Sequence, residues 1–137
     1  MKDPISETNL EYYLGKLEPA YESLAEQKIG RTLDQYGIPF FYRHPTLIYE
    51  SGRRELWYPD FTLPTFDDMV IEYLGRYHQN KLVIPPERKQ EVYRQNDIPA
   101  LLLKPTDMAR SDWVEKLYKT LENTYHRPLT GCLLYDQ

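Results

Sequence analysis

The fold of this chain is decided by two segments, WYPDFTLP at residues 57–64 and VIEYLG at residues 70–75. Both are rich in aromatic and aliphatic residues and are typical of strands. If they form a hairpin centred on Phe66, Asp60 and Glu72 lie directly across from each other. Like charges that face each other on neighbouring strands repel. A positive group should therefore lie between them, and a divalent cation with oxygen ligands is the natural candidate.

The chain before this hairpin predicts a helix and an extended segment. From about residue 18 to 36, apolar side chains recur with a period near 3.6. A proline suits the first turn of this helix, and Gly37 suits the position just past its end. Residues 38–49 read as an extended segment that Pro45 bends or places at a sheet edge. Residues 1–17 are polar with scattered aromatics and are interpreted as a peripheral arm or a short helix.

The chain after the hairpin predicts a helix, a buried strand and a last helix. Pro86 opens the first of these helices, and the run from Ala100 to Lys104 is short and apolar. The segment from Cys132 to Tyr135 is short enough to dock as a further strand. The predicted order is helix, three strands, helix, strand, helix, which makes residues 18–137 one mixed α/β domain. The predicted boundaries after residue 50 are strands at 56–63, 69–74 and 100–104, and helices at 86–96 and 107–125.

Composition excludes several classes of protein. A length of 137 residues suits one domain, and 41% hydrophobic residues are ordinary for a soluble protein. Because Cys132 is the only cysteine, no internal disulfide or cysteine-rich zinc site can form. No apolar run reaches the ~20 residues of a membrane helix, so we expect a cytoplasmic protein with no membrane partner. The net charge is −4, but residues 76–110 hold seven basic and four acidic residues, which allows a local basic face.

Two interpretations of the acidic pair remain open at this point. In the first, Pro59 and Asp60 form an ordinary turn, and Glu72 pairs with a nearby lysine or arginine. In the second, both carboxylates bind a metal ion. Glu72 lies in a strand that is otherwise apolar on both faces, where an unpaired carboxylate costs several kcal/mol. This favours a paired or metal-bound carboxylate.

The two segments, together with the predicted element order, resemble the core of the restriction-endonuclease-like nucleases, the superfamily of the PD-(D/E)xK motif. The resemblance extends from about residue 21 to 104 and implies metal-dependent hydrolysis of phosphodiester bonds, with DNA as the expected substrate. It assigns Asp60 and Glu72 as ligands of Mg²⁺, for which Mn²⁺ would substitute. Glu26 matches the acidic residue on the first helix that can complete the metal shell directly or through water.

The chain departs from the motif at its lysine, because that position holds Leu74. A lysine there would share a face with Glu72 and would orient the attacking water. Some members of the superfamily carry this lysine on the following helix, which makes Lys89 the best candidate and Lys81 the second choice. The alternative is a catalytically inactive module that binds nucleic acid or a protein partner.

Basic residues near this helix are the candidates for contacts with the substrate. The chain is too short for a separate targeting domain, so we expect a homodimer or a component of a larger nuclease complex. The predicted phosphate contacts are Arg76, Lys81, Arg88 and Arg94.

Overall fold

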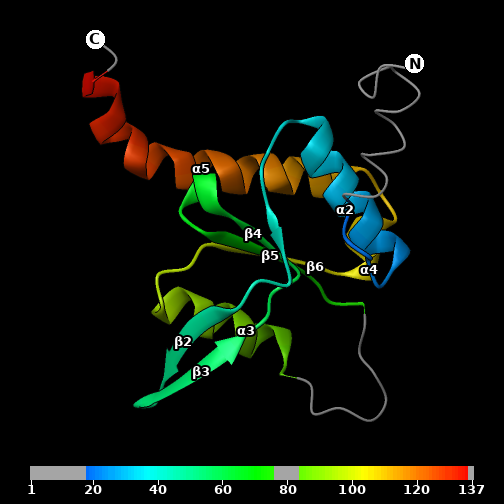
Figure 1. Ribbon diagram of the computed structural model, residues 1–137, viewed down its shortest axis with the longest axis horizontal. Helices are drawn as coiled ribbons and strands as arrows, with labels where there is room; N and C mark the ends of the chain where they lie inside the picture. Colours follow the sequence, from blue (N-terminus) through cyan, green and yellow to red (C-terminus); the bar gives the residue numbers. More distant parts are fainter. Residues whose placement is uncertain (1–17, 76–83, 136–137) are drawn as a thin grey trace, which may run out of the picture.

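The computed structural model describes residues 18–75 and 84–135, with side chains described as far as residue 124. Its centre is a four-stranded sheet in the order β1-β4-β5-β6 (Figure 1). All neighbours are antiparallel except β5 and β6, which are parallel and are joined through a helix, as predicted. The four strands are β1 (Phe41–Tyr42), β4 (Phe61–Leu63), β5 (Met69–Tyr73) and β6 (Ala100–Leu103).

Two layers cover this sheet. Helices α2 (Leu24–Gln35) and α5 (Asp112–Tyr135) lie on one face, and α4 (Pro105–Met108) leads into α5. Helix α3 (Pro86–Gln95) lies on the other face, beside a separate hairpin of β2 (Thr46–Glu50) and β3 (Arg53–Trp57) (Figure 1). None of the described helices combines the length and the apolar character that a membrane crossing requires.

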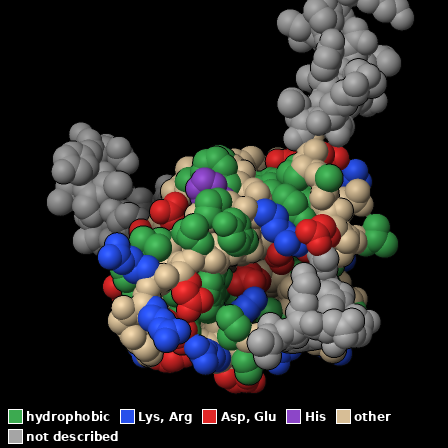
Figure 2. Space-filling view, turned by 60° about the horizontal axis from the view of Figure 1, so that its bottom comes forward, with side chains coloured by type: hydrophobic (Ala, Val, Ile, Leu, Met, Phe, Trp, Pro, Cys, Tyr) green, Lys and Arg blue, Asp and Glu red, His purple; other side chains and the backbone are tan. Residues whose placement is uncertain are grey.

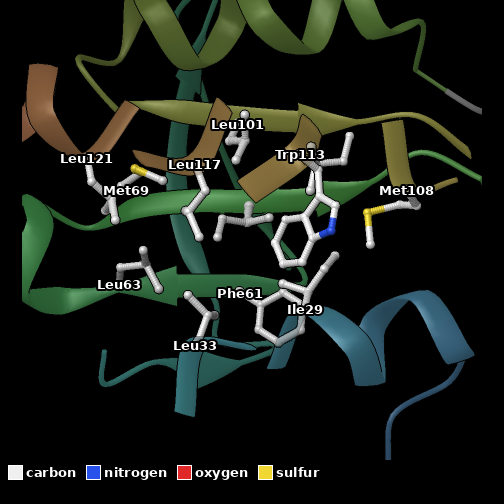
Figure 3. Packing of buried hydrophobic residues seen from close by; sticks show 12 residues of the cluster. Ile29, Leu33, Phe61, Leu63, Met69, Leu101, Met108, Trp113, Leu117 and Leu121 are labelled. Carbon is white, nitrogen blue, oxygen red and sulfur yellow. The ribbon is translucent and has the colours of Figure 1, made fainter. Parts of the chain in front are cut away.

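Strand alternation divides the apolar side chains into two cores. Ile71 points to the α2 and α5 face, where side chains from both helices and the sheet interdigitate around Trp113 (Figure 3). Val70 points the opposite way and packs with Ile48 and Tyr93. This period-two pattern means that Glu72, next to Ile71, faces the α3 side of the sheet.

The hairpin register agrees with the prediction from sequence. Phe61 pairs with Ile71 and Leu63 with Met69, so the turn is centred on Phe66, within a short 3-10 helix at Pro64–Phe66. Continuing the same register by one residue places Asp60 opposite Glu72.

The strand predicted at 56–63 is in fact two strands in two sheets. Residues up to Trp57 pair with β2, and residues from Phe61 pair with β1 and β5. Pro59 lies between them and has no backbone N–H for a ladder, so the chain changes sheets there. The extended segment 38–49 is divided in the same way, with the predicted bend near Pro45 separating β1 from β2.

Three helix boundaries differ from the prediction. The first helix begins at Leu24, because the Ser23 side chain accepts the Glu26 N–H and caps it. The last predicted helix is divided into α4 and α5. The strand predicted at 132–135 is wrong, since α5 continues as helix to Tyr135. A short apolar run fits a strand or a helix equally well when only its periodicity is considered.

Candidate metal and phosphodiester site

Asp60 is buried at the point where the chain enters β4. Its side chain is 11% exposed, and Oδ2 accepts the backbone N–H of Tyr73 at 2.8 Å. Burial raises the pKa of Asp60 to about 6, and the negative charges of Glu26 and Glu72 add to this effect. The Tyr73 N–H and the charge of Arg43 act in the opposite direction. The protein therefore holds Asp60 in a place where its ionised form lacks enough compensating positive charge.

Glu72 is held by two side chains of α3. Lys89 Nζ donates to Oε1 at 2.7 Å, and the Tyr93 hydroxyl donates to Oε2. Lys89 and Tyr93 are one helical turn apart, so both reach the same face of the sheet. Tyr93 is fully buried, and burial together with the charge of Glu72 raises the pKa of its hydroxyl. Tyr93 thus stays a hydrogen-bond donor that fixes the Glu72 carboxylate.

Arg43 links Asp60 to the first helix. Its guanidinium lies 3.2 Å from Glu22, 3.3 Å from Glu26 and 3.5 Å from Asp60. Glu26 is fully buried and also accepts the Tyr42 hydroxyl. Arg43 has a φ of 57°, the left-handed region that non-glycine residues rarely adopt. Such strain persists only where the surroundings enforce it, which is common at functional sites.

The positive charge expected between the two carboxylates comes from the protein in this structure. Arg43 neighbours Asp60, and Lys89 neighbours Glu72. Among residues 18–75 and 84–124, no group of three or more histidine, cysteine or acidic side chains is arranged to hold a metal. Mg²⁺ needs only one or two protein carboxylates and takes water and phosphate oxygens as its other ligands. Asp60 and Glu72, both oxygen donors on opposed hairpin positions, fit that requirement.

A pocket of about 190 Å³ opens beside Glu72 and Lys89. Figure 2 shows a hollow on the side that carries α3 and the β2–β3 hairpin, where acidic, basic and hydrophobic side chains come together. The candidate site is therefore accessible from outside. The other lining residues are Leu56, Trp57, Tyr58, Pro59, Ile84 and Tyr93.

The predicted phosphate contacts are only partly described. Arg88 pairs with Glu50 at 2.6 Å, and Arg94 pairs with Glu91 one turn earlier on α3. Both arginine side chains are more than half exposed. Arg76 and Lys81 lie outside the described residues.

Sequence reasoning missed Arg43 and Tyr93. Tyr93 could have been found, because it is four residues after Lys89 and so shares its helix face. Arg43 could not have been found without the pairing of β1 with β4. This pairing places Tyr42 opposite Phe61, and the Arg43 N–H then donates a hydrogen bond to the Asp60 carbonyl.

Comparison with known proteins adds information about the fold. No protein-family model matches the chain, and no curated protein matches it. A solved structure described as the catalytic domain of the homing endonuclease I-Bth0305I is similar, with a TM-score of 0.51 and 19% sequence identity. The similarity covers 75% of this chain and 97% of that chain. At this identity it shows the fold alone, so the chain has a mixed α/β fold resembling that of an endonuclease catalytic domain, which confirms the predicted fold class.

Proposed function

We propose that this protein is a Mg²⁺-dependent nuclease that hydrolyses phosphodiester bonds in DNA. The observation that supports this most is the contact between Lys89 and Glu72, opposite the buried Asp60. It supplies from α3 the lysine that the motif lacks at Leu74. The similarity to an endonuclease catalytic domain agrees with this assignment at the level of fold.

In this proposal Asp60 and Glu72 would hold a metal ion, which would supply a Lewis acid for the phosphoryl oxygen and lower the pKa of a bound water. The Tyr93 hydroxyl and the Tyr73 N–H orient the two carboxylates. The Lys89 ammonium stabilises negative charge that develops on the phosphate.

Glu26 acts on the site through its ion pair with Arg43. As the only fully buried carboxylate of the described residues, it holds the guanidinium beside Asp60. Our expectation that Glu26 also completes the metal shell, directly or through water, stays a prediction. Glu22, Glu26 and Asp60 place three carboxylates around the Arg43 guanidinium.

The substrate contacts are proposed from charge. Arg94 would exchange its exposed partner Glu91 for a phosphate at little cost, because surface ion pairs contribute only ~0–1 kcal/mol. Arg88 would leave Glu50, whose side chain is 18% exposed. Arg76 and Lys81 are proposed as further contacts. Assembly as a homodimer or within a larger nuclease complex is part of the same proposal.

A second candidate function is a binding module without catalysis. The pairing of both carboxylates with protein cations favours it, as does the buried Leu74 at the motif lysine position. Such a module would grip nucleic acid or a protein without taking up metal.

Cleavage assays distinguish the two. Supercoiled plasmid and single-stranded DNA would be incubated with protein and Mg²⁺, Mn²⁺ or EDTA. We expect metal-dependent cleavage that Asp60→Asn and Glu72→Gln abolish and that Glu122→Gln, an exposed position on α5, leaves intact. Cleavage by either site variant at the wild-type rate would rule out the site, and absence of cleavage by pure wild-type protein would favour the binding module.

A further inference from the structure

The pocket beside the candidate site has an aromatic wall. Trp57 and Tyr58 line it from the end of β3, and Glu72 and Lys89 line its other side. Its volume of about 190 Å³ is below the ~300–1,000 Å³ of pockets for drug-sized ligands. It therefore suits a small planar group that lies next to a charged one.

The two rings of this wall differ, because the Trp57 ring packs against the protein and the Tyr58 ring is exposed. The Trp57 ring packs edge-to-face on Tyr93 at 5.3 Å, and its Nε1–H donates to Glu55 at 3.4 Å. Tyr58 is 57% exposed and makes no hydrogen bond with other described side chains. An aromatic ring exposed at the rim of a pocket has a free face on which another ring can stack.

We propose that this pocket takes one unstacked base of a DNA strand, next to the phosphate that Asp60 and Glu72 act on. The proposal rests on the proposed function and narrows its substrate to single-stranded DNA or a duplex with an unpaired nucleotide. Bases in an uninterrupted duplex are stacked and paired, so they cannot enter a side pocket without being extruded. Base–aromatic stacking tolerates every base, since each has a π face, so the pocket selects for strand structure and not for sequence.

The charges at the pocket agree with this occupant. A nucleotide joins a flat apolar base to an anionic phosphate, and the pocket joins an aromatic wall to the Lys89–Glu72 ion pair, whose ammonium is the group that can face the phosphate. Leu56, next along the strand and 56% exposed, extends the apolar side outward.

The test compares two tyrosines of the same hairpin. Tyr58 and Tyr49 are 57% and 56% exposed, and only Tyr58 lines the pocket. Tyr58→Ala and Tyr49→Ala would be made in an Asp60→Asn background with EDTA, so that no strand is cut. Fluorescence anisotropy would measure binding of one labelled oligonucleotide as a single strand, a matched duplex, a duplex with one unpaired nucleotide, and the RNA equivalent of the single strand.

We expect the parent protein to bind the single strand and the interrupted duplex more tightly than the matched duplex. Tyr58→Ala should weaken binding of those two DNAs by about tenfold, as expected for the loss of one base–aromatic stack, and Tyr49→Ala should not. Equal binding of all DNAs, or equal effects of the two substitutions, would overturn the pocket assignment. RNA bound as tightly as DNA would overturn the assignment to DNA.

This result is separate from that of the cleavage assay. Binding that depends on Tyr58, with no metal-dependent cleavage by wild-type protein, would support the pocket and reject the nuclease. Cleavage lost in Asp60→Asn but unaffected in rate and substrate preference by Tyr58→Ala would support the nuclease and reject the pocket.

Discussion

The ionised carboxylate of Asp60 should destabilise the folded protein, because burial raises its pKa. Its pKa is raised from 3.8 to about 6, mainly by burial. Because the folded pKa lies above the unfolded one, the native state binds the proton more tightly than the unfolded state does. The contribution of Asp60 to stability is therefore fully present below pH ~4 and is lost as the pH rises through about 6.

The magnitude follows from the rise of the Asp60 pKa from 3.8 to about 6. Each unit corresponds to ~1.4 kcal/mol, so the ionised carboxylate costs about 3 kcal/mol at pH 7. Asp60→Asn removes the charge and keeps an oxygen that can accept the Tyr73 N–H. We expect the variant to be more stable than wild type by about 3 kcal/mol at pH 7, or about 10 °C in Tm for a domain of this size. Near pH 4 the two proteins should be equally stable.

Urea denaturation of both proteins in EDTA, from pH 4 to 8, measures this difference. Asp107→Asn is the matched control, because hydrogen bonding to Lys116 lowers the pKa of Asp107. Its contribution to stability is present above the unfolded pKa and is lost as the pH falls, so this variant should be less stable than wild type at pH 7. An Asp60→Asn variant that is less stable than wild type at pH 7 would refute the argument from burial.

Other substitutions test the site and the core. Lys89→Met should reduce cleavage by ~10²–10³-fold and leave Mn²⁺ binding by calorimetry in place; loss of both would make Lys89 a structural residue. Tyr93→Phe removes the hydroxyl that orients Glu72 and should weaken Mn²⁺ binding by ~10–100-fold without loss of helix signal in circular dichroism; unchanged affinity would show that the hydroxyl orients nothing. Trp113 is 1% exposed in the core, so Trp113→Ala should lower the unfolding free energy by ~3–5 kcal/mol. Leu24 is 83% exposed, so the control Leu24→Ala should lower it by ~0.5 kcal/mol or less. Similar losses for the two variants in urea denaturation would contradict the described packing.

Much of the arrangement could be predicted from short-range patterns. The turn centre at Phe66 was enough to set Asp60 opposite Glu72, because an antiparallel register is fixed once its turn is known. The choice of Lys89 came from the resemblance to nucleases that carry this lysine on the following helix, and the structure places its Nζ 2.7 Å from Glu72 Oε1. The catalytic roles of these residues stay predictions.

The rest depends on contacts between distant segments. The strand-forming residues on either side of Pro59 do not by themselves show that the chain leaves one sheet and enters another at this proline. The left-handed conformation of Arg43, and its place among the carboxylates of Glu22, Glu26 and Asp60, arise only when β1 pairs with β4. The helical continuation of α5 to Tyr135 was missed because a short apolar run does not distinguish helix from strand.

A crystal soaked in Mn²⁺ tests the central claim most directly, through the anomalous signal of the metal. We expect one peak bonded to carboxylate oxygens of both Asp60 and Glu72, with Arg43 or Lys89 displaced from at least one of them. Carboxylates still paired with Arg43 and Lys89, with no peak between them at a Mn²⁺ concentration that saturates the protein in solution, would contradict it.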